Sequence, residues 1–523
     1  MKILPDGDPV DLTHDQTQKL HPEFSLDGTK IVYGTYQDRE FSWDTWEVPV
    51  LGGEAKRMFK NVTGLTWVSP RQLLFSEIKM GAHMGVVTSD ENRSNKRDVF
   101  LPMSEPRMAH YSYLSPDGKS VLLAEMDDDH LWEPCRVVPF DGSNEGRKVG
   151  PPGGGCTAGA WSRDGKWIYL TSNAVEGNHI WRQRFPDGKP EQITFGPTEE
   201  EGIAMSPDGG SIITAVALEN SSLWLHDAKG ERQIPIEGNP AQPKFTPDAA
   251  KLVYRIVKEP PSEYAWYRDS GEVRVVDLGT GRGEPVVRGL QAFDYDLSKD
   301  GNQVVLQTAG PDAKPQFWLA PLDHSSPPKQ VPNAEGGFPR FLPNGDILFR
   351  RTEGSNALGT TGIMYKIRPD GSGLQKALDA PILIPISTTP DGKWFQAWAP
   401  LASTGFPASQ LFPLDGGRPV HVATATGFTW SPDARYVSVT SSALVGTGKA
   451  YVIPLPPGQM LPKIPPDGFT SEDQIARLPG AKKIEVAGTD VSVNGGVIPG
   501  PSPDVYLFYR NRVQRNLYRI PIR

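Results

Sequence analysis

Histidine and acidic side chains recur just before the first strand of several repeated units in this chain. Imidazole and carboxylate groups hold a divalent metal ion or orient a polar ligand when they converge on one point. The candidate ligand-binding residues are His21, His110, Glu199, Glu200, Glu201, Asp294 and Asp296. The alternative is that these side chains hydrogen-bond neighbouring loops and frame a water-filled channel. If the units share one ring, the candidates meet at its central channel.

The sequence lacks the signatures of common enzymes. It has no G-x-S-x-G elbow, no G-x-x-x-x-G-K-[ST] loop, no kinase catalytic loop and no H-E-x-x-H motif. We therefore assign no catalytic residue and expect a binding module. We expect no cofactor other than a divalent metal ion at the candidate residues. His179 and Trp43 are expected to pack within and between strands.

A turn motif close to Ser-Pro-Asp-Gly positions these residues and recurs along almost the whole chain. Its copies begin at Ser25, Ser69 (degenerate), Ser115, Ser162, Ser206, Thr246, Ser298, Leu342, Thr389 and Ser431. Proline fixes φ at the second position of the turn, and the aspartate side chain hydrogen-bonds the backbone that follows it. Glycine then takes a left-handed conformation. A strand-rich repeat of ~40–50 residues is typical of β-propellers.

Each repeat contains two hairpins and therefore four strands, which make one propeller blade. The sequence predicts an all-β chain of about eleven antiparallel blades. Because propellers usually have ~4–8 blades, we expect two of them. The first is predicted at 1–236, completed by strands from 490–523, and the second at 237–489. An outer strand at 10–13 is expected to pair with the C-terminal strands and close a ring, which removes exposed edges. A short helix is expected to begin near Ser471.

Composition limits the partners. The net charge of −8 and the absence of a long basic run argue against nucleic acid. No stretch reaches the ~18–20 apolar residues that span a bilayer, and the N-terminus lacks the apolar core of a signal peptide. A monomer is expected. Cys135 and Cys156 form either a disulfide or two buried thiols.

The repeats resemble the TolB-like, WD-like propeller repeat. Longer segments are similar to the propeller regions of acidobacterial serine/threonine protein kinases. These segments are Trp43–Glu54, Pro134–Gly142, His179–Ile193, Thr198–Asp208 and Gln514–Ile522. The resemblance covers essentially the whole chain, but the chain has no kinase domain and no membrane segment. We therefore assign no residue a role in kinase activity.

The resemblance implies a periplasmic or otherwise extracytoplasmic bacterial propeller that senses or docks a ligand. We expect a non-catalytic module that recognises a protein, peptide or glycan. The resemblance to the kinase propellers implies a role as the sensor part of a serine/threonine kinase. TolB-like repeats also occur in polysaccharide lyases and peptidases. The alternative function is therefore a metal-dependent hydrolase or polysaccharide lyase with its site at the channel mouth.

Overall fold

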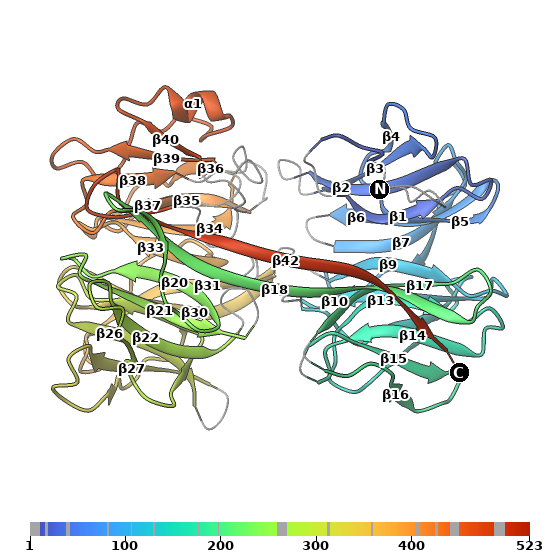
Figure 1. Cartoon of the computed structure of the whole chain (residues 1–523), viewed down its shortest axis with the longest axis horizontal. Helices are drawn as coiled ribbons and strands as arrows, with labels where there is room; N and C mark the ends of the chain where they lie inside the picture. The colour runs from blue at the N-terminus through green and yellow to red at the C-terminus, as the bar shows by residue number, and fades with distance from the viewer. Residues whose placement is uncertain are drawn as a thin grey trace. The chain divides into compact units, whose positions relative to one another are not determined.

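The computed structural model describes residues 11–522 apart from 16–18, 38–41, 81–82, 106, 129–130, 176, 197, 259–268, 311–313, 357–358, 403–406, 424–426, 440–448 and 486–496. The regular elements of this part are β-strands and one short helix, α1 (Glu472–Ala476), which follows Ser471 as predicted (Figure 1). The chain forms two compact units. Unit 1 is 1–218 with 355–360 and 513–523, and unit 2 is 219–354 with 361–512.

Unit 1 contains four complete four-stranded blades. Their strands are β1 (Leu20–Phe24), β2 (Lys30–Gln37), β3 (Ser42–Pro49) and β4 (Lys56–Phe59); β5 (Thr63–Ser69), β6 (Gln72–Met80), β7 (His83–Ser89) and β8 (Arg97–Phe100); β9 (Met108–Leu114), β10 (Ser120–Met126), β11 (Arg136–Pro139) and β12 (Arg147–Lys148); β13 (Cys156–Trp161), β14 (Trp167–Ser172), β15 (His179–Arg184) and β16 (Pro190–Gln192). The second and third blades join through one parallel residue pair between β7 and β9.

Unit 2 contains five further blades. Their strands are β20 (Asn239–Phe245), β21 (Lys251–Val257), β22 (Gly271–Asp277), β23 (Gly283–Pro285) and β24 (Gln291–Ala292); β25 (Asp294–Leu297), β26 (Gln303–Ala309), β27 (Pro315–Pro321) and β28 (Lys329–Gln330); β29 (Gly337–Phe341), β30 (Ile347–Asn356), β31 (Gly359–Ile367) and β32 (Gln375–Lys376); β33 (Ile384–Thr388), β34 (Trp394–Pro400), β35 (Pro407–Pro413) and β36 (Val420–Ala423); β37 (Phe428–Trp430), β38 (Tyr436–Val439), β39 (Lys449–Pro454) and β40 (Lys482–Glu485).

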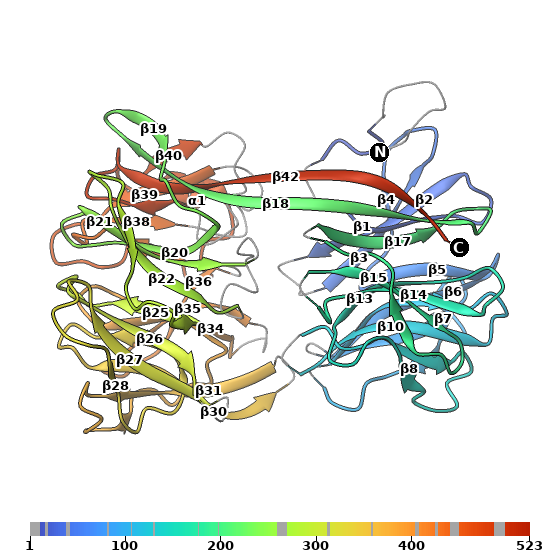
Figure 2. The same cartoon turned by 60° about the horizontal axis from the view of Figure 1, so that its bottom comes forward.

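The remaining sheet has strands that are divided between the units. It contains β17 (Glu199–Met205), β18 (Ser211–Asp227), β19 (Gly230–Gln233), β41 (Ile498–Pro499) and β42 (Tyr506–Pro521), and β18 lies beside β42 (Figures 1 and 2). This sheet is the tenth blade-like sheet of the described chain, and its strands contribute to both units. The division between units falls inside β18 and β42, whereas the sequence placed it at 236/237. The segment 355–360, which includes the end of β30 and the start of β31, is also counted with unit 1.

The predicted closure by an N-terminal strand is not seen in the described residues. Position 10 lies outside them, and 11–15 form no strand. The C-terminal strand β42 pairs with β18 and β41 instead. The reason is that β18 and β42, at 17 and 16 residues, offer each other a long edge. Leu12 still packs on the first blade, against Tyr33 and Val48.

The repeated turn has the predicted geometry. In eight copies the Ser or Thr hydroxyl donates to the Asp two residues on, over 2.5–2.7 Å. That Asp also accepts a backbone N–H, as Lys119 donates to Asp117 at 3.1 Å. These bonds lower the pKa of Asp117, which keeps the carboxylate ionised. The fourth residue has a positive φ, for example +70° at Gly118.

Two turns have alanine at this left-handed position, Ala249 (φ +54°) and Ala434 (φ +59°). A left-handed conformation costs a residue with a Cβ about 1 kcal/mol more than it costs glycine. We therefore expect Ala434→Gly to raise the free energy of unfolding by about 0.5–1 kcal/mol, measured by urea denaturation. Gly118→Ala is the matched reverse change, because its Cβ would meet no atom within 4 Å. A loss of stability in Ala434→Gly would contradict the assignment.

The first strand of most blades carries an irregularity near its start. Register shifts occur at Leu20/Glu23, Ala241/Lys244 and Gly337/Arg340, among other blades. A left-handed residue lies in several of these bulges: His21 (φ +48°), Gly64 (+58°), Gly202 (+74°), Gln242 (+52°) and Phe338 (+58°). First strands of neighbouring blades contact one another, as β5 contacts β9. The bulges therefore set the direction of side chains near the centre of each unit.

Candidate functional site

The predicted site residues are divided between the two units. His21, His110 and Glu199–Glu201 belong to unit 1, whereas Asp294 and Asp296 belong to unit 2. The modules therefore do not share one ring, and the two groups of candidates are described separately.

Asp294 and Asp296 tie neighbouring blades of unit 2 together. Asp294 is 1% exposed and forms an ion pair with Arg340 of the next blade at 2.7 Å. It also accepts a hydrogen bond from Gln242 of the preceding blade at 2.8 Å. Asp296 pairs with Lys244 and accepts the backbone N–H of Phe341 at 2.7 Å. Both carboxylates are thus satisfied by the protein, which is the interpretation that the sequence left as the alternative to ligand binding.

The same network continues into the following blade. Arg340 is 2% exposed, and its Nε donates to the carbonyl of Ile386 at 2.8 Å. Lys244, Asp296 and Arg340 each lie two residues before the first residue of the repeated turn. This spacing therefore marks the position at which first strands of neighbouring blades of unit 2 exchange polar contacts.

In unit 1, the two predicted histidines lie in a group of rings that we call the aromatic cluster: His21, Trp43, His110, Tyr111 and Trp132. The ring centroids of His21 and Tyr111 are 3.4 Å apart. His110 meets Trp43 edge-on at 5.2 Å and lies 5.4 Å from Trp132. Trp132 stacks on Tyr111 at 5.9 Å. The aromatic cluster therefore contains contacting rings from β1, β3, β9 and the β10–β11 loop.

The members of the aromatic cluster lie at one end of unit 1. Strands of a blade alternate in direction, so the starts of the first and third strands share an end with the loop between the second and third strands. We call this the first-strand end. Gly64 permits the close approach of β5, because a Cβ there would lie 3.0 Å from the carbonyl oxygen of His110. His21, Trp43, Tyr111 and Trp132 are half-buried and His110 is buried.

His21 is neutral at physiological pH, because burial lowers its pKa to about 4. The unfolded chain binds a proton near pH 6.5, so the stability that His21 contributes is complete above pH 6.5 and is lost as the pH falls toward 4. We expect this loss to reach about 2–3 kcal/mol. His21→Asn, which tolerates the left-handed backbone, should remove this part of the acid sensitivity in urea titrations at several pH values. An unchanged pH profile would contradict the burial of a neutral imidazole.

The three consecutive glutamates have different surroundings. Glu200 is 4% exposed and contacts His179 Nδ1 at 3.1 Å and the Thr194 hydroxyl at 2.6 Å. Glu199 accepts a hydrogen bond from Asn178 at 3.3 Å, and Glu201 is exposed. Glu200 and His179 therefore connect the fourth and fifth blades, and Glu201 is the glutamate of the three that faces solvent. No three His, Cys, Asp or Glu side chains among the described residues form a group suited to a metal ion.

Glu23 was not among the predicted site residues. It occupies in β1 the position, two residues before the turn, that Lys244, Asp296 and Arg340 occupy in unit 2. Its side chain is exposed, and yet desolvation by the surrounding protein raises its pKa. Comparison of the repeats position by position would have found it.

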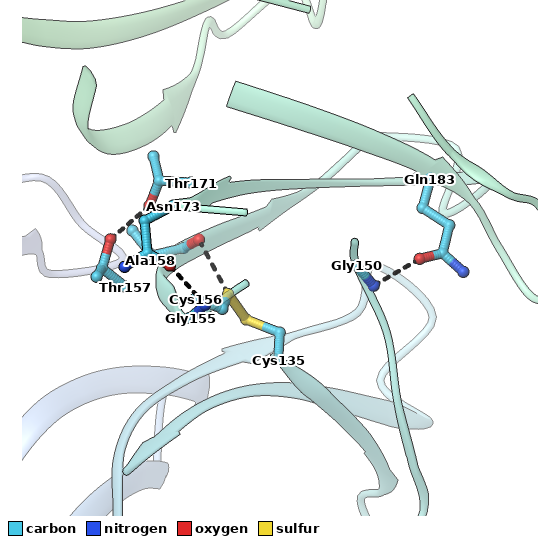
Figure 3. The surroundings of a disulfide bond; sticks show 9 residues. All are labelled: Cys135, Gly150, Gly155, Cys156, Thr157, Ala158, Thr171, Asn173 and Gln183. Carbon is cyan, nitrogen blue, oxygen red and sulfur yellow. Dashed lines mark hydrogen bonds between the residues drawn. A yellow bond between two sulfur atoms is a disulfide. The ribbon is translucent and has the colours of Figure 1, made fainter. Parts of the chain in front are cut away.

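A disulfide between Cys135 and Cys156 braces the first-strand end of unit 1 (Figure 3). Both cysteines are buried, and their Cα atoms are 5.2 Å apart. The bond joins the residue before β11 to the start of β13 in the next blade. The backbone N–H of Cys156 donates to the carbonyl of Glu133 at 2.8 Å, beside Trp132. The disulfide therefore holds the loop that carries one ring of the aromatic cluster.

No family model and no curated protein matches the chain. Solved β-propeller structures do resemble it. TolB from Acinetobacter baumannii is 13% identical over 67% of this chain and 76% of that chain, with a TM-score of 0.20. The β-propeller domain of the trilobed protease from Pyrococcus furiosus is 12% identical over 60% and 97%, with a TM-score of 0.26. Oligogalacturonate lyase from Vibrio parahaemolyticus is 10% identical over 76% and 88%, with a TM-score of 0.27. This similarity carries no argument about function.

Proposed function

We propose that the protein is a non-catalytic binding module that recognises a protein, peptide or glycan at the first-strand end of unit 1. The observation that carries this proposal is a set of exposed apolar side chains in the loops at that end. They are Leu101 (40% exposed), Met103 (86%), Leu131 (43%), Val175 (43%) and Phe195 (72%). Exposed apolar side chains at one end of the unit favour contact with a partner, because the contact removes them from water.

The disulfide supports an extracytoplasmic location for this module, since buried disulfides form and persist in oxidising compartments. No helix in the described part of the chain is long and apolar enough to cross a membrane. A role as the sensor part of a serine/threonine kinase rests on the sequence resemblance alone. No observation on the described residues favours the metal-dependent hydrolase or lyase.

The experiment is a selection of displayed random peptides and of arrayed glycans on the whole chain. Ligands are then tested against a double variant, Met103→Asp with Phe195→Asp, and against Leu51→Asp. Leu51 is 91% exposed but lies in the turn between the third and fourth strands, at the other end of the blade. We expect ligands that bind the wild type and Leu51→Asp but not the double variant. Ligands that bind all three proteins equally, or the absence of any ligand, would overturn the proposal.

A further inference from the structure

The fifth blade of unit 1 lacks a fourth strand among the described residues. Its other strands are β17, the start of β18 and residues 513–521 of β42 (Figures 1 and 2). In the described chain, the sheet continues beyond β42 with β41, which pairs with Tyr506 and Leu507 in unit 2. The edge of 513–521 that faces away from β18 therefore carries backbone N–H and C=O groups that can pair with another strand.

Leu517 lies in this open third strand, and a backbone hydrogen bond fixes its position in the blade. The N–H of Ile522 donates to the carbonyl of Gly210, in the first turn of the blade, at 2.9 Å. In the fourth blade, Phe185 makes the same bond to the equivalent turn residue at 2.8 Å. Five residues before the donor lie Leu517 in the fifth blade and Ile180 in the fourth. Ile180 is 0% exposed, whereas Leu517 is 62% exposed.

The other blades show that this position is normally buried. The same backbone bond identifies six further residues there, each at most 2% exposed. They are Thr45, Cys135, Val273, Phe317, Ser409 and Ala450. Leu517 therefore lacks a covering group that the corresponding residues have, and burying it would be favourable because it is a large apolar side chain.

The fourth strand supplies this cover in four of those blades. There the residue after the fourth strand donates its N–H to the carbonyl of the buried third-strand residue, over 2.7–2.9 Å. The pairs are Val149 with Cys135, Ile193 with Ile180, Val286 with Val273, and Val331 with Phe317. The two members of each pair pack in the same core cluster. The missing cover is therefore a short extended segment that ends in valine or isoleucine.

The end of β42 leaves room for such a segment. A groove with a volume of about 460 Å³ lies there, and its lining includes Gln192, Ile193, Ile212, Ile520 and Ile522. Fourth strands run antiparallel to third strands and begin where the third strand ends. A strand added to β42 would therefore begin beside this groove.

The chain's own candidate for this edge is the N-terminal strand predicted at 10–13. Position 10 lies outside the described residues, and 11–15 form no strand. Leu12 packs against Tyr33 and Val48 of the first blade. In this structure the edge is therefore open to a separate peptide.

We propose that unit 1 binds an extended peptide of a partner protein as the fourth strand of its fifth blade. The peptide has polar residues beside 518–520, followed by a valine or isoleucine that donates its N–H to the Leu517 carbonyl and packs on the Leu517 side chain. Backbone hydrogen bonds supply affinity, and the aliphatic side chain supplies specificity. This site is separate from the loops at the first-strand end and goes beyond the proposed function.

The test titrates the whole chain into a fluorescein-labelled peptide that copies residues 186–194, which include Ile193, the covering residue of the fourth blade. We expect saturable binding, measured as a rise in anisotropy. Alanine in place of the isoleucine should weaken binding about tenfold, because less apolar area leaves water. N-methylation of the isoleucine should weaken binding about fivefold, because the donor to the Leu517 carbonyl is lost.

Leu517→Asp should weaken binding of the unmodified peptide about tenfold, because it replaces the apolar contact by a charge. Leu374→Asp is the matched control and should bind as the wild type does, since Leu374 is 38% exposed in the loop between β31 and β32 of unit 2. Met103→Asp with Phe195→Asp should also bind unchanged, which separates this site from the proposed function. Because Leu517 is exposed, its variant is expected to fold, which circular dichroism verifies.

The absence of binding, or equal binding of the three peptides, would overturn the inference. Binding that Leu517→Asp leaves unchanged, or that the Met103 and Phe195 double variant abolishes, would also overturn it. Binding to Leu12→Ala but not to the wild type would show that the chain's own N-terminal segment holds the edge, which excludes a separate partner. The library selection decides the proposed function independently of these results.

Discussion

Replacing Arg340 with methionine is expected to lower the free energy of unfolding of unit 2 by about 3–5 kcal/mol, since it leaves a buried carboxylate without its cation. Arg340 and Asp294 are 2% and 1% exposed and pair at 2.7 Å. Arg340 also donates to the Ile386 carbonyl. The substitution therefore removes contacts with the blades on both sides. Urea denaturation followed by fluorescence and circular dichroism measures the loss.

Lys376→Met is the matched control in the same unit. Lys376 forms an ion pair with Asp379 at 2.5 Å, but both side chains are largely exposed. Exposed pairs contribute little, so no measurable loss is expected. The double variant Arg340→Met with Asp294→Leu should be more stable than Arg340→Met alone, because no buried charge remains unpaired. Equal losses in Arg340→Met and Lys376→Met would refute the structural role assigned to this pair.

The second large effect concerns the disulfide of unit 1. Its cysteines are separated by 21 residues in sequence. By the chain-entropy model, a disulfide that closes a loop of this size stabilises the folded state by about 3 kcal/mol, because it restricts the unfolded chain. We expect Cys135→Ser with Cys156→Ser to lower the free energy of unfolding of unit 1 by about that amount. The reductant dithiothreitol should destabilise the wild type in the same way but leave the double variant unchanged.

Loss of the disulfide is also expected to affect the aromatic cluster. Because Cys135 lies three residues after Trp132, loss of the disulfide should loosen the stacking of Trp132 on Tyr111. It should therefore lower the affinity for any ligand bound at the aromatic cluster.

Mass spectrometry without reductant should find the two cysteines bonded in protein secreted into an oxidising compartment. Free thiols under those conditions would remove the main support for an extracytoplasmic location.

The blades were predictable because their determinants are local. A Ser or Thr hydroxyl, the Asp two residues on and a left-handed residue form each turn within four residues, as at Ser115–Gly118. Alternation of apolar residues on either side of the turn then defines a hairpin. None of these signals requires contact with a distant part of the chain, so repetition along the sequence was enough to show them.

The candidate site was only partly predictable. The repeats placed His21 and His110 near the starts of first strands, where the structure finds them in the aromatic cluster. The sequence could not show that Asp294 is neutralised by Arg340, which lies 46 residues away. Nor could it show that Glu23 has no such partner among the described residues. Both facts depend on which side chain of the neighbouring blade reaches the same position.

The all-β class, the period of the repeat and the chemistry of each turn can be read from the sequence, since they follow from residues within one hairpin. The assignment of modules to units, the bond between Cys135 and Cys156 and the neutralisation of particular carboxylates became known only from the folded chain, because these properties arise from contacts between blades. Charge pairing and disulfide formation require atoms within a few ångströms, and a repeat leaves the neighbours of each residue unspecified until the blades pack.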